Sequence, residues 1–253
     1  MGIDAEYGRL VMALEIVAVP AFADNYLWLV HDDVSGETAV VDPGDGDAVL
    51  DAAAQRGWTI DTILNTHWHP DHTGGNLKVK EVTGATIYGP AAEQARIPGL
   101  DIELAEGDRV SIGDHVGEIW EVPGHTLGHI AYVFGDSGVA FVGDTLFAMG
   151  CGRLFEGTAE QMHHSLGRFA SLPDATKLYP AHEYTLSNAL FSAQAAPSDD
   201  AVLARLASVQ ALREHGEMTV PTTVADEKAT NLFVRAPDPA AFAELRAAKD
   251  SFR

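Results

Sequence analysis

The stretch Asn65-Thr66-His67-Trp68-His69-Pro70-Asp71-His72-Thr73-Gly74-Gly75 decides how this chain folds and what it can bind. It follows the apolar run 58–64, which we interpret as a buried strand. Three histidines and one aspartate lie within residues 67–72, and imidazole and carboxylate groups are ligands of zinc, iron and manganese. Four donors this close cannot all reach one ion while the backbone stays regular. A tight loop after the strand would point two donors to each side, which predicts two adjacent metal ions.

Length and composition limit the possible partners. The chain has 253 residues, enough for one large domain or for a larger domain with a small one. Its formal net charge is −21, with 37 acidic and 16 basic residues, which argues against a nucleic-acid partner. No apolar stretch is long enough to span a membrane, and a single cysteine suits a reducing compartment. We therefore expect a cytoplasmic enzyme with a small-molecule substrate, either a monomer or a weak oligomer.

The first residues carry no targeting signal that we can identify. Residues 10–23 are apolar, but Asp4 and Glu6 precede them in place of basic residues, and Glu15 interrupts them. We interpret the segment as a first strand. Met12 is an alternative start of the protein, so the sequence leaves open whether residues 1–11 are native.

Up to residue 183 the pattern mixes strands with helices and predicts an α/β domain. Strands are expected at 15–19, 26–31, 38–41, 86–88, 101–104, 109–112, 115–121, 129–134, 139–142 and 177–179. Helices are expected at 47–55, 74–82 and 158–172. Asp47 is the expected N-cap of the first helix, and Thr158 with Gln161 forms a capping box for the third.

Strand signals nearly vanish after residue 183. Helices are expected at 186–194 and 200–215, residues 220–235 read as irregular, and Asp238-Pro239 opens a final helix through residue 249. We therefore divide the chain into a catalytic domain, 1–183, and a small C-terminal helical domain, 184–253.

Further metal-ligand donors follow later strands of the first domain. Donors at strand ends can meet at one edge of a sheet even when they are far apart in sequence. The predicted ligands are His67, His69, Asp71, His72, His125, Asp144 and His182. We assign His67, His69 and His125 to one ion and Asp71, His72 and His182 to the other. Asp144, with two carboxylate oxygens, would bridge them.

Three further residues receive roles other than metal ligand. Asp42 ends a preceding strand and is the expected hydrogen-bond partner of one ligating histidine. His129 begins a strand close to His125, and we interpret it as structural. Cys151 is interpreted as a buried apolar residue instead of a reactive thiol.

The ligand pattern resembles a known superfamily. His67-x-His69-x-Asp71-His72, together with the three later ligands, resembles the metallo-β-lactamase superfamily, which implies an αββα sandwich with a dinuclear site at one edge. The segments 143–147, 150–158, 181–185, 221–223, 227–231 and 245–252 resemble the hydroxyacylglutathione hydrolases, or glyoxalase II enzymes. This resemblance covers nearly the whole chain from Leu14, including the C-terminal helices.

The resemblance implies a thioester hydrolase. Its substrate would be S-D-lactoylglutathione, hydrolysed to D-lactate and glutathione by a metal-bridged hydroxide, the second step of methylglyoxal detoxification. The chemistry agrees, because water shared by two divalent ions loses a proton near neutral pH, whereas free water has a pKa of about 15.7. As a metal ligand, Asp71 would orient this hydroxide and so act in catalysis. Zinc is the expected metal, with iron or manganese as alternatives.

The resemblance also implies how the substrate's tail is bound. Carried over by motif, the residues that hold the glutathione carboxylate are Arg153, Tyr184, Arg246 and Lys249. Arg246 and Lys249 lie three residues apart on one expected helix and therefore share a face. Some relatives have Lys and Tyr where this chain has Arg153 and Phe155, and Phe155 lacks the tyrosine hydroxyl.

Other functions of the same fold remain as alternatives. An acyl-homoserine lactonase would share the ligands but would have no use for the basic C-terminal helix. A mononuclear glutathione persulfide dioxygenase needs only His67, His125 and Asp144, and would leave the second group idle. An RNA-processing nuclease is disfavoured by the net charge, and a non-enzymatic metal-binding protein is the alternative outside enzymes.

Overall fold

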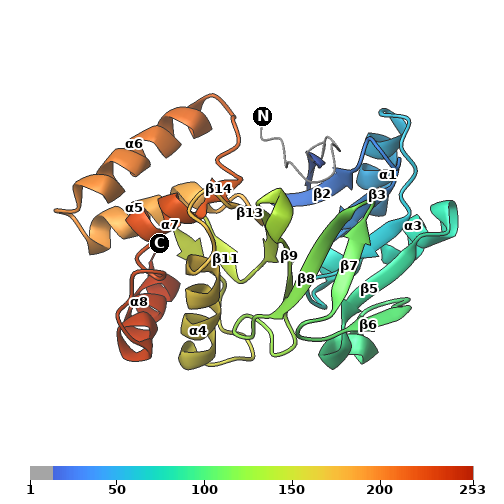
Figure 1. Ribbon diagram of the computed structural model, residues 1–253. Coiled ribbons are helices and arrows are strands. Elements are labelled where there is room, and N and C mark those ends of the chain that lie inside the picture. Colours follow the sequence, from blue (N-terminus) through green and yellow to red (C-terminus); the bar gives the residue numbers. More distant parts are fainter. Residues whose placement is uncertain (1–13, 253) are drawn as a thin grey trace, which may run out of the picture.

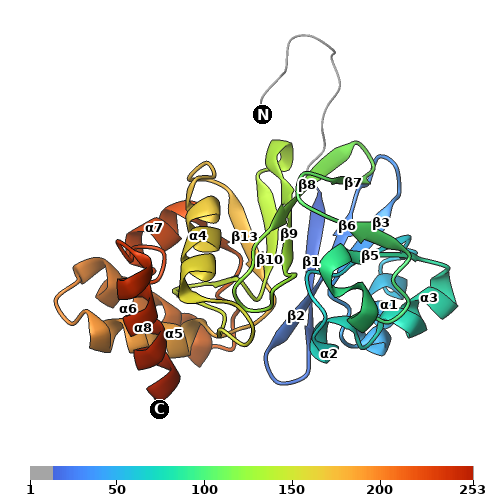
Figure 2. The ribbon, with the colours of Figure 1, turned by 90° about the horizontal axis from the view of Figure 1, so that it is seen from below.

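The computed structural model describes residues 14–252, so the question of whether residues 1–11 are native lies outside the described residues. Two six-stranded sheets pack face to face, and helices cover both outer faces (Figures 1 and 2). This four-layer arrangement confirms the αββα sandwich. Among the described residues, no helix is long and apolar enough to cross a membrane.

The first sheet is formed by the first six strands of the described chain. Its strands, in order, are β1 (Glu15–Ala21), β2 (Asn25–His31), β3 (Thr38–Val41), β4 (Thr62–Leu64), β5 (Thr86–Pro90) and β6 (Ile102–Leu104). Strands β3 to β6 are parallel. The carboxyl ends of β3 and β4 therefore meet at one edge, and Asp42 lies beside the loop that begins at Asn65. The helices that connect these strands are α1 (Gly46–Ala54), α2 (Pro70–Thr73), α3 (Asn76–Thr83) and the 3-10 helix η1 (Ala91–Arg96).

The second sheet contributes the remaining donors from the same edge. Its order is β14 (Thr222–Thr223), β13 (Lys177–Pro180), β10 (Val139–Gly143), β9 (Ile130–Phe134), β8 (His115–Glu121) and β7 (Arg109–Ile112). Strands β10 and β13 are parallel, so Asp144 and His182 follow neighbouring carboxyl ends. The loop with His125 connects the antiparallel strands β8 and β9. The smaller elements are the 3-10 helix η2 (Gly135–Ser137) and the two-stranded pair β11 (Leu146–Phe147) and β12 (Gly150–Cys151).

Each interface between layers has its own apolar core. Between the sheets lie side chains such as Trp28, Tyr132 and Phe141. Between the first sheet and the helices α1 and α3, Ile63 of β4 shares an apolar core with Val79 of α3. Strand β2 is buried at all seven positions because both faces of the first sheet are covered.

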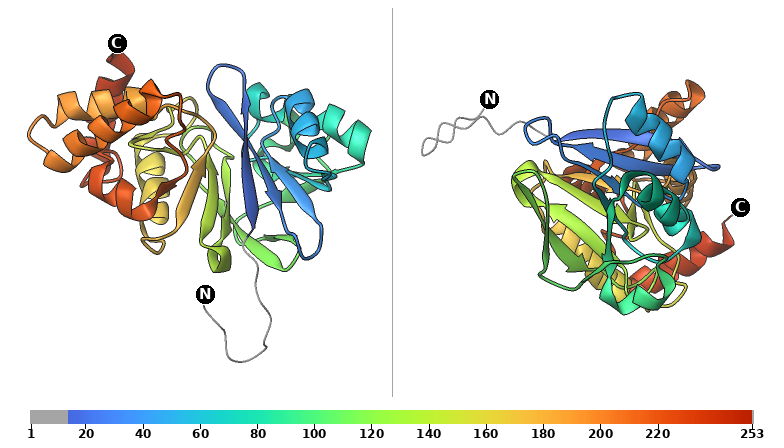
Figure 3. Two further views of the ribbon diagram at one scale, coloured as in Figure 1. Left: turned by 90° about the horizontal axis from the view of Figure 1, so that it is seen from above. Right: turned by 90° about the vertical axis from the view of Figure 1, so that its right-hand side faces the viewer.

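The C-terminal segment packs on the outer face of the second sheet. Its helices are α5 (Thr185–Ala195), α6 (Asp200–Glu214), α7 (Val224–Thr230) and α8 (Pro239–Ser251), and they gather beside α4 (Ala159–Ala170) in Figure 3. Phe233 and Phe242 share an apolar core with Met162 and Phe169 of α4. This contact confirms a C-terminal helical region, while the division at residue 183 stays a prediction.

The prediction that residues 220–235 are irregular is wrong. Thr222 and Thr223 form β14 on the edge of the second sheet, and α7 follows at once. A two-residue strand has no periodicity to detect, and tertiary pairing with Lys177 and Leu178 stabilises it. Helix α7 begins at the cap Thr223, whose hydroxyl accepts from the amide of Asp226.

Several element boundaries also differ from the prediction. The N-cap of α1 is Asp45, whose carboxylate accepts from the amides of Asp47 and Ala48. The expected helix 74–82 is α3, which spans residues 76–83, and the short helix α2 precedes it because Pro70 starts a helical turn within the ligand loop. The expected strand 58–64 is shorter, since only 62–64 pairs with its neighbours.

Candidate active site

The first group of donors comes from both sheets. His67 and His69 lie in the loop after β4, and His125 lies in the loop between β8 and β9. Nε2 of His67 lies 2.9 Å from Nδ1 of His69, and Nε2 of His125 lies 3.0 Å from the same atom. Three ring nitrogens thus converge on one point, as in the predicted first ligand set.

The second group also joins the two sheets. Asp71 and His72 belong to α2, whereas His182 follows β13. Oδ2 of Asp71 lies 3.3 Å from Nε2 of His72 and 3.5 Å from Nε2 of His182. One ligand atom from each of these residues lies within 4.8 Å of the others, as in the predicted second set.

Asp144 lies between the two groups. Its Oδ1 is 3.5 Å from Nε2 of His72 and 3.4 Å from Nε2 of His182, while its Oδ2 is 3.4 Å from Nε2 of His125. Within residues 14–252, Asp144 Oδ1 and His72 Nε2 are buried without a hydrogen-bond partner. Burying such polar atoms costs free energy unless another group satisfies them.

Three of the histidine rings are held by a hydrogen-bond partner on the side away from the centre. Nδ1 of His72 lies 3.0 Å from Oδ2 of Asp42, which confirms the expected support by that aspartate. Nδ1 of His182 lies 2.8 Å from Oδ1 of Asp24, and Nδ1 of His125 donates to the carbonyl of Arg153 at 2.9 Å. These contacts leave Nε2 of these three rings to face the centre, which is how ligating histidines are oriented.

Charges at the centre favour ionised carboxylates. Burial alone would raise the pKa of Asp144, but the charges of His182 and His72 hold it well below its usual range. Burial would likewise raise the pKa of Asp71, but the charge of His72 and the hydrogen bond from Asn25 together lower it well below its usual range. Burial holds the pKa of His67 well below its usual range, so this ring stays neutral. Neutral imidazoles and ionised carboxylates are the forms that bind metal ions, so a bound ion would displace a proton from His72 and from His182, whose pKa values are raised by Asp144 against the effect of burial.

The unsatisfied atoms, the converging nitrogens and the ionised carboxylates fit a dinuclear metal site. Asp42 also lies near His67 and His72. Its oxygens, however, already accept hydrogen bonds from the amide and hydroxyl of Thr66 and from His72. We therefore describe Asp42 as a partner that orients the site.

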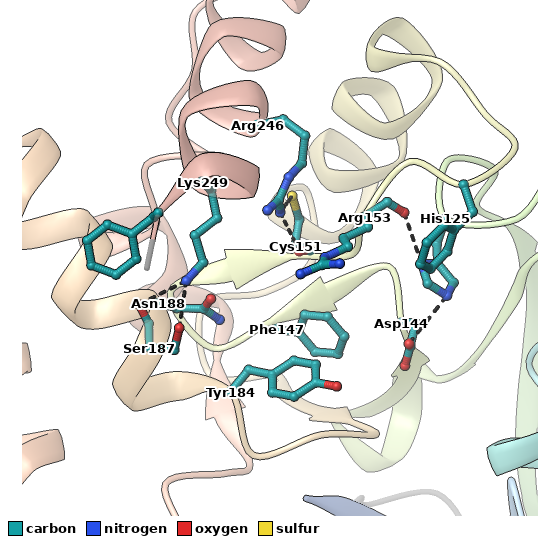
Figure 4. Close-up of a pocket in the computed structure, with 12 residues that line it drawn as sticks. His125, Asp144, Phe147, Cys151, Arg153, Tyr184, Ser187, Asn188, Arg246 and Lys249 are labelled. Carbon is teal, nitrogen blue, oxygen red and sulfur yellow. Dashed lines mark hydrogen bonds and ion pairs between the residues drawn. The ribbon is translucent and has the colours of Figure 1, made fainter.

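A pocket of about 440 Å³ opens beside this centre (Figure 4). His125 and Asp144 lie at one end of it, and Lys249 lies at the other. All four residues predicted to bind the substrate line this pocket: Arg153, Tyr184, Arg246 and Lys249. Residues from α5 and α8 thus reach the same cavity as two predicted metal ligands.

The cations of the pocket differ in how they are held. Arg246 is buried and donates to the carbonyl of Cys151 at 2.9 Å and to the carboxylate of Asp250 at 2.8 Å. Lys249 donates to the carbonyl and the hydroxyl of Ser187 at 3.0 and 2.7 Å. Burial, with the nearby charge of Arg246, lowers the pKa of Lys249 to about 8. The guanidinium of Arg153 extends into the pocket (Figure 4).

Two aromatic side chains border the metal-ligand histidines. The ring of Tyr184 stacks on His182, with centroids 4.7 Å apart and planes within 4°. Phe155 is 62% exposed and its ring lies edge-on to His69 and His125. Both positions leave the aromatic surface open to a ligand in the pocket.

Sequence reasoning missed several residues of the site. Asp24 ends the turn between β1 and β2, and Asn25 begins β2 and donates through Nδ2 to Asp71 at 3.0 Å. Ser187 and Asn188 of α5 also line the pocket. The available signal was the polar turn Ala23-Asp24-Asn25 between two strands, and it carries no motif by itself.

His129 has the structural role that we predicted. It is buried, and its Nε2 accepts from the amide of Asp144 at 3.1 Å. Cys151 is also buried, as predicted, and burial raises the pKa of its thiol to about 11.

Comparisons with known proteins agree with this geometry. A family model described as Metallo-beta-lactamase superfamily matches residues 24–182, and one described as Hydroxyacylglutathione hydrolase C-terminus matches residues 183–252. A hydroxyacylglutathione hydrolase of Maricaulis maris is 49% identical over 247 residues, which cover 92% of this chain and 96% of that protein.

Two solved structures share the fold. ETHE1 from Myxococcus xanthus has a TM-score of 0.71 and 26% identity, over 93% of this chain and 90% of its own. TTHA1623 in a di-iron-bound form has a TM-score of 0.57 and 26% identity, over 66% of this chain and 91% of its own. With both family models and the relative of 49% identity, the chain belongs to the hydroxyacylglutathione hydrolase family of the metallo-β-lactamase superfamily.

Proposed function

We propose that this protein is a thioester hydrolase that converts S-D-lactoylglutathione into D-lactate and glutathione, the second step of methylglyoxal detoxification. The observation that carries the proposal is the single pocket that joins His125 and Asp144 to Arg246 and Lys249. A hydrolytic centre at one end and cations at the other suit a thioester with an anionic tail. The relative named hydroxyacylglutathione hydrolase supports the same substrate.

The proposed ligand sets follow the two groups of donors. His67, His69 and His125 would hold one divalent ion, Asp71, His72 and His182 the other, and Asp144 would bridge them. We propose zinc, with iron or manganese as alternatives, because nitrogen and oxygen ligands suit all three. When bound, two such ions lower the pKa of a shared water from about 15.7 to near neutral and supply a hydroxide nucleophile.

Asp71 is the proposed catalytic residue of this chain. Asn25 donates to its Oδ2, and the low pKa of the carboxyl keeps it ionised. An ionised carboxylate at the centre accepts a hydrogen bond from the nucleophile and orients it, so Asp71 has no need to act as a free base. The leaving thiol of glutathione has an ordinary pKa of about 8.5 and departs without an acid. Because the bound ions would supply the hydroxide, the site requires neither a serine nor a cysteine nucleophile.

The glutathione part of the substrate would lie along the cationic end of the pocket. Arg153, Arg246 and Lys249 would pair with its carboxylates, and Tyr184 would hydrogen-bond through its hydroxyl. In a chain of net charge −21, three cations around one cavity are a local exception, and they select for an anionic ligand. The proposed C-terminal domain, 184–253, supplies Tyr184, Arg246 and Lys249 to this pocket.

The alternatives account for fewer residues of the site. A glutathione persulfide dioxygenase needs His67, His125 and Asp144, and the second donor group would then have no ligand role. An acyl-homoserine lactonase would use both groups but would leave the cations of α8 without a partner. We retain a cytoplasmic location and a monomer or weak oligomer as predictions from the sequence.

The test is turnover by protein of defined metal content. S-D-lactoylglutathione, an acyl-homoserine lactone and glutathione persulfide are compared as substrates, with thiol release, ring opening and oxygen consumption as readouts. We expect thiol release that requires metal. Oxygen consumption with glutathione persulfide and no thioester hydrolysis would overturn the proposal.

A further inference from the structure

The ligands of the proposed His67–His69–His125 ion lie on loops from different sheets. His67 and His69 follow β4 of the first sheet, whereas His125 lies between β8 and β9 of the second. The position of one loop relative to the other therefore sets how well the three nitrogens converge. Contacts that join the two loops outside the metal centre can control the affinity of this ion.

Glu156 makes such a contact from the outside. Its Oε1 accepts from Nε1 of Trp68, between the two ligands of the first loop, at 3.2 Å. Its Oε2 accepts at 2.9 Å from the amide of Leu127, two residues after His125. One carboxylate thus connects both ligand loops.

Arg96 of η1 completes the connection. Its Nη1 donates to Oε1 of Glu156 at 2.7 Å, and its guanidinium lies over the ring of Trp68, 4.3 Å from the centroid. The hydrogen bond from Arg96 lowers the pKa of Glu156 to about 2, so the carboxylate is ionised at neutral pH. Hydrogen bonds to an ionised acceptor are stronger than neutral ones.

Glu93 makes a parallel contact on the inside. It is buried and accepts from the amide of Trp68 at 2.8 Å and from the amide of Gly128 at 3.1 Å. Glu93 fixes the backbones of the two loops, whereas Glu156 fixes the Trp68 side chain, whose ring lies edge-on to His69 with centroids 4.5 Å apart. Phe155, next to Glu156 in the chain, also contacts His69 and His125.

The other ion has separate supports. Asn25, Asp42 and Asp24 contact Asp71, His72 and His182 respectively. In the described part of the chain, Glu156 accepts hydrogen bonds from Trp68, Arg96 and Leu127 and from none of these residues. The two ions thus rely on different surrounding residues.

We propose that Glu156, held by Arg96, is a positioning residue that sets the affinity of the His67–His69–His125 ion and leaves the Asp71–His72–His182 ion unaffected. The inference rests on the ligand sets of the proposed function but not on its substrate. Replacing the carboxylate by an amide leaves one acceptor oxygen, so Trp68 and Leu127 can no longer both be held, and the released group can turn to water because Glu156 is partly exposed. The folded chain is then kept while the ligand loops lose their outer link.

The test is metal binding by purified apoprotein, measured by calorimetric titration with Zn²⁺, for wild type and Glu156→Gln. Loss of a residue that orients metal ligands costs about 10- to 100-fold in affinity. We expect one of the two binding events to weaken by at least about tenfold. Anomalous diffraction from crystals at limiting Zn²⁺ should then show the remaining ion between Asp71, His72 and His182.

Three further variants separate positioning from a loss of folding or charge. Glu160→Gln removes the same charge from an exposed position in the first turn of α4, and should bind both ions like wild type. Arg96→Gln keeps Glu156 bonded to Trp68 and Leu127, and should weaken the same ion less. Asp24→Asn should weaken the other ion. Circular dichroism checks that each variant is folded.

The proposal would be overturned if folded Glu156→Gln bound both ions with the affinities of wild type. Loss of the Asp71–His72–His182 ion would also overturn it. Failure of the substrate assignment gives a different pattern. Wild type would then bind both ions without hydrolysing the thioester, and Glu156→Gln would still lose one of them.

Discussion

Oδ1 of Asp144 lies 3.5 Å from Nε2 of His72, and within residues 14–252 both atoms are buried without a hydrogen-bond partner. The other oxygen of Asp144 faces His125, in the opposite group of donors. Since these atoms remain unsatisfied by the protein, the site stores a free-energy cost that a bound cation removes. Folding and metal binding are therefore coupled at this aspartate.

Asp144→Asn tests this coupling. An amide has one oxygen acceptor and no charge, so it cannot bridge two cations as a carboxylate does. We expect fewer than two metal ions per chain by elemental analysis, and a kcat at least about 100-fold lower. A variant with two ions and wild-type kcat would contradict the bridging role.

Removing the metal ions should lower the Tm of the wild type. A ligand that binds only the folded state stabilises it by about 2.7 kcal/mol at 100 times its Kd, and more when it binds tighter. Differential scanning calorimetry before and after chelation measures the shift, and added Zn²⁺ should reverse it. An unchanged Tm would show that the donors are satisfied without metal.

Arg246 and Lys249 should affect substrate binding more than the chemical step, because both lie at the far end of the pocket from Asp144. We expect Lys249→Ala to raise KM by about tenfold with a smaller change in kcat, since a hydrogen bond to a charged group contributes about 1.5–3 kcal/mol. Unchanged KM in both alanine variants would remove these residues from the binding site.

Stability should distinguish the two cations. Arg246 is 5% exposed and its alanine variant leaves the carbonyl of Cys151 without its donor, so we expect its Tm to fall as well. Lys249 is half-buried, and within residues 14–252 its only hydrogen-bond partner is Ser187, so its alanine variant should keep a Tm near wild type. Steady-state kinetics and thermal unfolding of the same preparations check both expectations.

Cys151 should be inert in the folded protein. It is 4% exposed, and burial raises the pKa of its thiol to about 11, so little thiolate forms near pH 8. We expect no alkylation by iodoacetamide in the native state, full alkylation in denaturant, and a kcat within about twofold of wild type for Cys151→Ala. Rapid native alkylation with loss of activity would instead indicate a reactive thiol.

The sequence predicted which donors come together because they follow the ends of strands, and their role as metal ligands stays a prediction. His67 follows β4 of the first sheet, whereas Asp144 and His182 follow the parallel strands β10 and β13 of the second, and these strand ends lie at the same edge of the sandwich. The hydrogen bonds that orient these side chains could not be predicted from the sequence. Asp24 approaches His182, and Glu156 approaches Trp68, from 158 and 88 residues away, and neither has a local pattern.

Elements stabilised by tertiary contacts were also missed. The strand at Thr222 is two residues long, and Glu227 of α7 is buried among polar partners that include Arg205 and Asn231. A helix with a buried, paired glutamate lacks the apolar stripe that identifies surface helices. The α/β domain, in contrast, has long alternating or apolar strands, and their positions were predicted within a few residues.

Lys249 gives a prediction about pH. Its pKa is lowered from an ordinary 10.5 to about 8, chiefly by burial, so the side chain is charged below about pH 8 and neutral above it. Only the charged form pairs with a carboxylate of the substrate. Because kcat/KM reports the ionisation of the free enzyme, it should fall as the pH rises through about 8.

Lys249→Arg is the control for this pH dependence. A guanidinium stays protonated throughout the range, so this variant should lose the decline near pH 8 while keeping a cation in the pocket. Titration of the substrate's own amine affects both enzymes equally and cancels in the ratio of their kcat/KM values. We expect that ratio, wild type over Lys249→Arg, to fall between about pH 7 and pH 9. A constant ratio would show that Lys249 keeps its charge or does not contact the substrate, and direct titration of the Lys249 side chain by NMR would decide between the two.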